Sequence, residues 1–357
     1  MPNWKRIKLN KFEFPKVVNY YKDYIKFDKQ LPKGVKLKRI DKVKNNLIID
    51  ALNEDIVGIG QLFTSQVMKS FNAGIGLYTP NDVKVSEPIR IQFNIDKENP
   101  TVLDHNVIYA EENSQVSILF DYYTDDSVEG FHNGITKVYA KENSIVNIIK
   151  IQRMNDKSHN FDSNIAYVEG RGQVNWISIE LGSHVSGSSF ATFLKNELSE
   201  GNLSSVYLGD GHRRMDLEYS MIHQGRRSIS NIETQGVLMD HARKVFRGNL
   251  DFKRGARHSN GSETEYAVLL DPTVVAHSIP ALLCDEDDVQ GEHAASAGQI
   301  DDNQLFYLMS RGLTEREAKK LIVEASFKPT LDKLNDFNLE DLRDDINKEI
   351  DRRLMNV

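Results

Sequence analysis

The sequence predicts a mainly β protein, built as a parallel β-helix (β-solenoid) with helical regions at both ends. The main observation is a repeat: YAEENSQV at 109–116 recurs as YAKENSIV at 139–146, 30 positions on, and more weakly as YVEGRGQV at 167–174. Each copy opens a strand in which apolar and polar residues alternate. No helical pattern interrupts these strands. A repeat of strands and short turns at this spacing indicates stacked coils that share one core.

The turns between the strands support this interpretation. Four residues of the three copies are expected at the corners of the coils, where left-handed or tight backbone is needed: Asn113, Asn143, Gly170 and Gly172. A jelly roll or β-sandwich is the alternative. Those folds normally carry Asn-Gly hairpin turns, which occur here only at 133–134 and 260–261. We therefore favour the β-helix.

Residues 1–70 are predicted to form an N-terminal region of mostly helical character. Residues 12–27 are rich in aromatics and lysine and have a loose helical period, while SQVMKSF at 65–71 has a clearer one. The β-helix is predicted over residues 71–298. It begins with the alternating residues 83–95, whose period of two is that of a strand.

A helical region is predicted over residues 299–357. Asp301 is a suitable cap for a first helix, and Gly312 suits a left-handed C-cap. Thr314 and Glu317 form a capping box for a second helix. We expect the buried aliphatic residues of this helix pair, with Leu305 and Phe306, to close the end of the solenoid, and its outer face to bind a partner.

The last 26 residues predict a further amphipathic helix. Its apolar stripe consists of Leu339, Leu342, Ile346, Ile350 and Leu354. We expect this stripe to pack on the rest of the chain, and partner docking is the alternative.

Composition excludes several classes of function. A net charge of −7 and a pI near 5.9 argue against nucleic acid as the main partner, and against DNA binding by the C-terminal helices. No apolar stretch is long enough to span a bilayer and the start of the chain lacks a signal-peptide core, so we expect a cytoplasmic protein without membrane association. No P-loop motif is present, so this chain is not expected to bind ATP.

Cys284, Glu292 and His293 form the cluster of residues with metal-ligand chemistry. Thiolate, imidazole and carboxylate together suit iron, although their spacing matches no fixed motif. Cys284 is the sole cysteine, which fits a reducing compartment and excludes an all-cysteine iron–sulfur site within one chain. The structural alternative is that the acidic run 285–288 is a solvated loop and that His293 is a hydrogen-bonded interior residue.

Two long segments resemble the C-terminal signature of the SufB/SufD family, the scaffold components of the SUF iron–sulfur cluster assembly system. They are EDDVQGEHAASAG at 286–298 and QLFYLMSRGL at 304–313. Further matches extend over most of the chain: 74–89, 216–232, 245–252 and 269–283. The resemblance implies a right-handed parallel β-helix between helical ends, in agreement with the repeat.

The resemblance also implies a role. Family members are non-catalytic scaffolds, so the chain is expected to pair with a SufB-like or identical subunit and to bind SufC, an ABC-type ATPase, through its C-terminal helices. The residues expected at the ATPase interface are Phe306, Tyr307, Arg311, Gly312 and Glu317. The alternative is a β-helix enzyme acting on carbohydrate, although the sequence shows no obvious aromatic platform for sugars.

The resemblance further implies which type of subunit this is. His293 matches the histidine that SufD-type subunits contribute at the interface with a SufB-type partner, and SufB-type subunits carry a functional cysteine that aligns near Val274. The cysteine is absent here, so the chain is SufD-like. We expect His293, with Cys284 and Glu292 as further ligands, to support a transient iron–sulfur cluster or iron shared with the partner.

Overall fold

The structure, a computed structural model, describes residues 12–27 and 29–355. Residues 1–11, on which the expectation about a signal peptide mainly rests, lie outside the described part. The chain is mainly β and forms a parallel β-solenoid of about 8 turns, with helices at the C-terminus. The predicted fold class is therefore confirmed.

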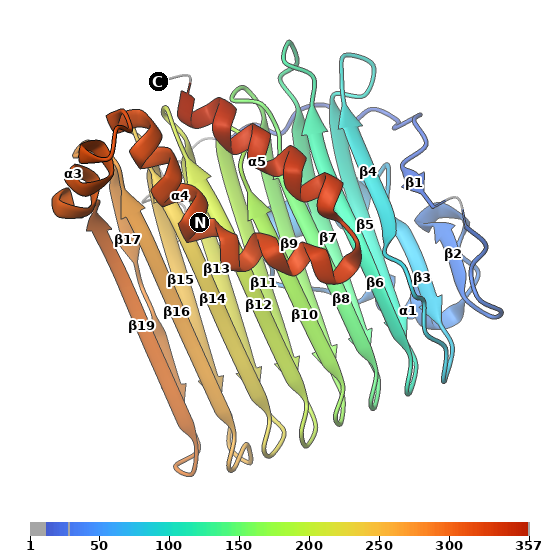
Figure 1. Ribbon diagram of the computed structural model, residues 1–357. Helices are drawn as coiled ribbons and strands as arrows, with labels where there is room; N and C mark the ends of the chain where they lie inside the picture. Colours follow the sequence, from blue (N-terminus) through green and yellow to red (C-terminus); the bar gives the residue numbers. More distant parts are fainter. Residues whose placement is uncertain (1–11, 28, 356–357) are drawn as a thin grey trace.

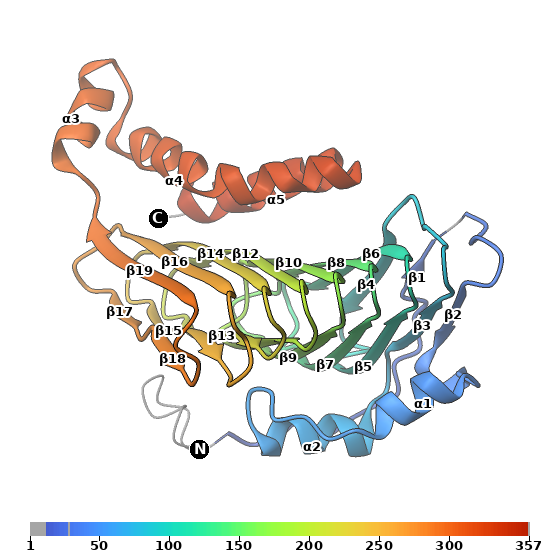
Figure 2. The ribbon, with the colours of Figure 1, turned by 90° about the horizontal axis from the view of Figure 1, so that it is seen from below.

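Each coil of the solenoid gives one strand to each of two sheets, whose strands run side by side (Figure 1) and whose inner faces are turned toward each other (Figure 2). The nine-stranded sheet is formed, in order, by β1 (Ile25–Lys26), β4 (Ile89–Ile95), β6 (Gln115–Thr124), β8 (Ile145–Arg153), β10 (Gln173–Glu180), β12 (Glu200–Gly209), β14 (Ile229–Leu238), β16 (Asn260–Leu269) and β19 (Gln290–Gln299). The ten-stranded sheet is formed by β2 (Lys36–Arg39), β3 (Ile75–Thr79), β5 (Thr101–Ala110), β7 (Phe131–Ala140), β9 (His159–Val168), β11 (Val185–Leu194), β13 (Arg214–His223), β15 (Arg243–Phe252) and β17 (Val275–Ser278). The short β18 (Ala281–Cys284) also pairs with β15.

The sequence repeat lies in register across the coils. Tyr109, Tyr139 and Tyr167 are successive partners in β5, β7 and β9. The corner residues Asn113 and Asn143 have φ values of 57° and 55°, as predicted. In the third copy the left-handed residue is Arg171, at 53°, and Gly170 and Gly172 flank it in the predicted corner. Gly172 meets the expectation of tight backbone, because an added Cβ would lie 2.9 Å from the backbone oxygens of Glu169 and Lys141. The corner is fixed by its place in the repeat, whichever residue stands there.

The N-terminal region closes one end of the solenoid. β1 pairs with β4 and β2 with β3, both antiparallel to the coils. A short 3-10 helix (Ile40–Lys42) follows β2. The helices α1 (Asn46–Asn53) and α2 (Gln61–Ser70) then cover the outer face of the ten-stranded sheet (Figure 2). The helix predicted around 65–71 is confirmed in α2.

Residues 12–27 form no helix, contrary to the prediction from their period. They run along the solenoid as an extended strap that ends in β1. Phe12 stacks on Phe131, with ring centroids 5.9 Å apart, and Tyr24 stacks on Phe93 at 4.9 Å. The aromatic residues are thus anchored one by one on different coils, and this long-range packing overrides a weak local helical preference.

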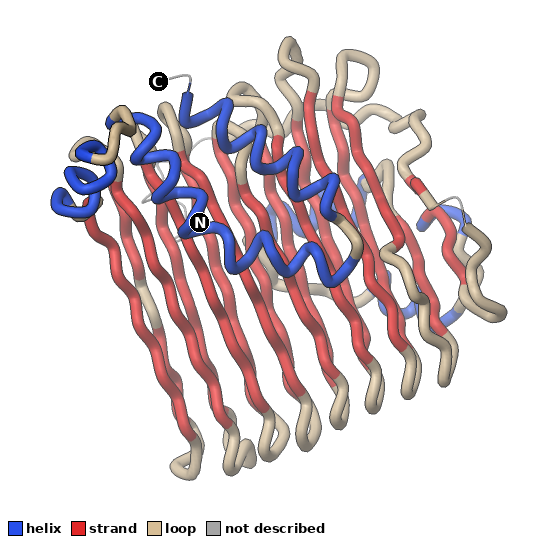
Figure 3. Tube along the Cα trace, in the orientation of Figure 1, coloured by secondary structure: helices blue, strands red, loops and turns tan. Residues whose placement is uncertain are grey.

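Most of the C-terminal helical region lies across the outer face of the nine-stranded sheet, and only its first helix does not (Figure 3). The helices of this region are α3 (Asp302–Ser310), α4 (Glu315–Asp332), a 3-10 helix (Lys333–Phe337) and α5 (Glu340–Met355). The predicted caps are present: Asp301 caps α3, and Thr314 with Glu317 forms the capping box of α4. The stripe of α5 is buried against outward apolar residues of β8 to β14, so its predicted packing is confirmed.

The helix α3 differs from the expectation. All of its residues are described and none is buried; Phe306 is 73% exposed. It projects past the end of the sheets, with α4 as its main neighbour (Figure 2). The expectation that Leu305 and Phe306 close the solenoid is therefore wrong, because α3 turns away from the last coil.

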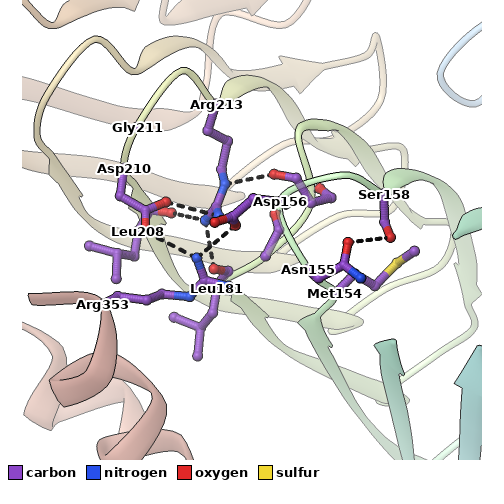
Figure 4. A network of polar contacts seen from close by, with 12 residues as sticks. Met154, Asn155, Asp156, Ser158, Leu181, Leu208, Asp210, Gly211, Arg213 and Arg353 are labelled. Carbon is purple, nitrogen blue, oxygen red and sulfur yellow. Dashed lines mark hydrogen bonds and ion pairs between the residues drawn. The ribbon is translucent and has the colours of Figure 1, made fainter. Parts of the chain in front are cut away.

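An arginine cluster fastens α5 to the coils (Figure 4). Arg213 is buried and donates to the backbone oxygens of Leu181 and Leu208 and to Asp156, while its Nη2 lies 2.8 Å from Asp210. Arg353 of α5 contacts the same two carboxylates, at 3.1 and 3.0 Å. Both arginines therefore share one pair of counter-ions, which fixes the end of α5 to the corners of the coils.

Candidate functional site at the open end of the solenoid

The two ends of the solenoid differ. At the first end the antiparallel strands β1 and β2 cover the coils, whereas β19 is the last strand of its sheet and pairs with β16 alone within the described chain. Almost every residue of β19 is exposed. Such a strand leaves a row of backbone N–H and C=O groups available for pairing with another chain. We call β17, β18 and β19 with their connecting turns the open end.

His293 and Cys284 both lie on the inner face of the last coil. Gly291 faces inward, because a Cβ there would meet Leu282 and Phe252, so the alternation of the strand also turns His293 inward. Cys284 is the partner of Phe252, a buried core residue, and shares its face. Both remain exposed, because no further coil covers them.

Glu292 lies on the opposite face of β19. It is the partner of Ser262, whose hydroxyl donates to Asn231 on the outer surface of the nine-stranded sheet. The structure thus places two of the three predicted ligands on one face and separates the third from them. Within residues 12–27 and 29–355, no three His, Cys, Asp or Glu side chains are grouped so that they could hold a metal ion.

The acidic run 285–288 is a corner turn tied to the preceding corner. Asp288 lies 3.1 Å from the Nδ1 of His258, and Glu286 accepts a hydrogen bond from the backbone N–H of Gly255. This backbone hydrogen bond is the main reason that the pKa of Glu286 is lowered. These contacts favour the structural interpretation of the acidic run as an exposed turn.

One coil further in lies a group of charged residues that the sequence analysis missed. Glu265 accepts hydrogen bonds from Lys244 and, at 2.8 Å, from the hydroxyl of Tyr207. Glu263 is only 1% exposed, and neither of its carboxylate oxygens has a hydrogen-bond partner in the described part of the chain. Burial, and then the charge of Glu265, raise the pKa of Glu263 to about 7.

The position of Glu263 is built into the fold. On the facing strand β15 stands Gly248, where an added Cβ would lie 2.5 Å from the Glu263 carboxyl carbon. The glycine therefore makes room for this side chain. The sequence does carry a signal for this group: Gly261, Glu263 and Glu265 stand at every second position of β16 and therefore share one face of the strand. Alternation alone does not tell which face is the interior.

The predicted ATPase-binding residues lie on or beside α3. Phe306 and Tyr307 are 73% and 55% exposed, and the guanidinium of Arg311 lies 5.2 Å from the Tyr307 ring centroid. Gly312 has a φ of +99°, as a left-handed C-cap requires. Glu317 accepts from the backbone N–H and the hydroxyl of Thr314, so its carboxylate stabilises the start of α4.

Together the fold and the site define a β-solenoid protein with one covered end, one open end and a projecting helix that carries exposed aromatic residues. A family model described as "SUF system FeS cluster assembly, SufBD core domain" matches residues 93–326. The chain belongs to this SufBD family of the SUF iron–sulfur cluster assembly system. The resemblance stated from the sequence is thereby confirmed.

Several relatives support the assignment. The iron–sulfur cluster assembly protein SufD of Bacillus subtilis is 27% identical over 285 residues, which are 79% of this chain and 64% of that protein. A SufBD family protein of Mycobacterium leprae is 29% identical over 71% of this chain and 29% of its own length. One of Staphylococcus haemolyticus is 25% identical over 72% and 56%. The chain thus spans less than two thirds of the length of each of these relatives.

The described helices also bear on membrane association. None of those within residues 12–27 and 29–355 is both long and apolar enough to cross a bilayer.

Proposed function

We propose that this chain is a scaffold subunit of the SUF system that pairs through its open end with a second β-solenoid, either SufB-like or a copy of itself. The observation that carries the proposal is the contrast between the two ends: β1 and β2, which end the sheets at the covered end, have 2 and 4 residues, whereas the exposed edge of β19 has 10. β19 also lacks the lysines and prolines that usually protect such an edge, and residues 294–298 are all small. Pairing of two open ends closes the assembly at two subunits, because neither covered end can continue it.

The pairing would bring chemical groups of two chains together. His293 and Cys284 face the inner side of the last coil, where a second solenoid would cover them. A second chain would supply the ligands that this chain lacks for iron or for a transient iron–sulfur cluster, which is the cargo of the assembly. In this proposal the chain catalyses no reaction and binds no ATP.

The second contact is with a SufC-like ATPase through α3 and the start of α4. Four large apolar side chains are exposed there: Phe306, Tyr307, Met309 and Leu321. Aromatic residues and arginine are enriched at the energetic centres of protein interfaces. α5 is fastened to the coils by Arg353, so α3 projects from a fixed base.

The carbohydrate-enzyme alternative gains no support. The structure does contain an aromatic ladder on the ten-stranded sheet, in which Tyr109 stacks on Tyr139 with centroids 5.5 Å apart and Tyr139 lies 5.3 Å from Tyr167. The ring faces are turned toward one another. A sugar would need an open ring face, so this ladder is a packing feature.

Co-expression with a SufC-type ATPase and mass measurement of the eluted complex test the proposal. We expect two scaffold subunits and two ATPases. Ala295→Lys places a charge on the inner face of the open end and should prevent pairing, whereas Ser296→Lys on the outer face is the control. Phe306→Asp with Tyr307→Asp should release the ATPase, and Tyr21→Asp, at a side chain 78% exposed near the covered end, should not. If none of these substitutions changed the mass of the eluted complex, both proposed contacts would be refuted.

A further inference from the structure

Glu263 is a buried carboxyl group, and the described residues around it supply no hydrogen bond that would explain its burial. Buried polar groups in proteins nearly always have hydrogen-bond partners, and each exception calls for a physical reason. Both oxygens of Glu263 lack a partner among the described residues, although the side chain is almost fully buried. The space that Gly248 leaves for it shows that the site is built for this side chain.

The position of Glu263 in the coils indicates what it is for. It is the strand partner of His293 in the parallel pair of β16 and β19. Neighbouring strands lie about 4.8 Å apart, and partners in register point to the same face. The two side chains are therefore neighbours on the inner face, the carboxyl in the last covered row and the imidazole in the exposed one.

Glu265 provides an internal comparison. It lies on the same strand and the same face, but its partner on β19 is Ala295, which has no polar side chain. It already accepts hydrogen bonds from Lys244 and Tyr207. Glu263, the carboxyl group beside an imidazole, is thus the one of the two whose oxygens are both free, within the described part of the chain, to accept a hydrogen bond.

We propose that Glu263 is a positioning residue for His293: the exposed imidazole, which makes no hydrogen bond to Glu263 in the conformation described above, turns inward so that the carboxyl accepts from one ring nitrogen and the other nitrogen is directed at the interface with the second subunit. A histidine that binds a metal almost always donates its other N–H to such an outer partner, which fixes the tautomer and the ring orientation. The hydrogen bond between Glu263 and His293 does not depend on the proposed function. The use of this hydrogen bond to orient a ligand for iron does rest on the proposed function.

The ring tautomer of His293 tests the hydrogen bond. In the 15N-histidine-labelled chain, with the signal assigned by His293→Gln, we expect one tautomer in the wild type and a mixture in Glu263→Met. Glu263→Gln should keep the single tautomer, because its amide oxygen still accepts, and the control Glu265→Gln should leave it unchanged. An unaltered tautomer in Glu263→Met, or an equal change in Glu265→Gln, would overturn the proposal.

A second measurement separates this inference from the proposed function. In the complex with the ATPase, Co²⁺ alone serves as the probe, and its affinity is followed by absorbance. Glu263→Met should weaken the His293-dependent binding by about 10- to 100-fold, the usual effect of losing an outer partner. If His293→Gln binds Co²⁺ as the wild type does, the proposed ligand role of His293 fails, while the tautomer result still decides the role of Glu263.

Discussion

The stability of this protein should depend on pH through Glu263, and Glu263→Gln should remove that dependence. The pKa of Glu263 is raised from 4.5 to about 7 in the folded chain. Between these two values the folded state binds more protons than the unfolded state, so the free energy of unfolding falls as the pH rises. Above the folded pKa the effect is complete, because the carboxyl is then ionised in both states.

The size of the effect follows from the shift. One pKa unit corresponds to about 1.4 kcal/mol, so roughly 2–3 kcal/mol of stability is lost between about pH 5 and about pH 8. Glutamine has nearly the same shape but no charge, so the variant should gain this amount over the wild type across that range. Urea unfolding at both pH values measures it.

A matched control separates Glu263 from all other titrating groups. Glu112 is an exposed carboxylate at a corner turn, and Glu112→Gln should follow the wild-type pH dependence. A difference between Glu263→Gln and wild type that is the same at both pH values would refute the reasoning, because it would show that Glu263 is not neutral when buried.

Three further substitutions test the contacts that hold the coils together. Arg213→Met should lower the free energy of unfolding, measured in urea, by about 3–5 kcal/mol, because it leaves buried acceptors unpaired. Arg353→Met should lower it less, because Asp210 still pairs with Arg213, and equal losses would contradict this order. Lys137→Met removes an ammonium that donates to three carbonyl oxygens at the end of α1, so stability should fall by about 1–3 kcal/mol and hydrogen exchange in α1 should rise; unchanged protection would count against it. Arg171→Asn should raise the melting temperature, with a gain of up to about 1 kcal/mol, since Asn tolerates the left-handed backbone that Arg171 adopts; a lower melting temperature would argue that the arginine side chain matters more.

Long-range packing decided the points on which the sequence predictions were wrong. The period of residues 12–27 resembles that of a helix, but Phe12 and Tyr24 are held apart by separate coils. The helix α3 was expected to cover the last coil and instead projects from it. For residues 12–27, long-range contacts outweigh the local helical period. For α3, the local pattern predicts a helix but carries no information about where that helix packs.

The sequence by itself determined the solenoid, the helix caps of α3 and α4, the packing stripe of α5 and the family. These features are local or repetitive: a period of two within a strand, a repeat between coils and a capping residue beside its helix are all visible along the chain. The sequence also suggested that His293 and Cys284 belong to a site, and this stays a prediction.

Only the tertiary structure decided which end of the solenoid stays open, which face of β19 carries His293, and that Glu263 lies behind it. The physical reason is that alternation along a strand defines two faces without saying which one is inside. Burial and hydrogen-bond satisfaction depend on partners about 30 residues away in the chain. The unpartnered carboxyl of Glu263 arises from those distant pairings, so no local pattern could have revealed it.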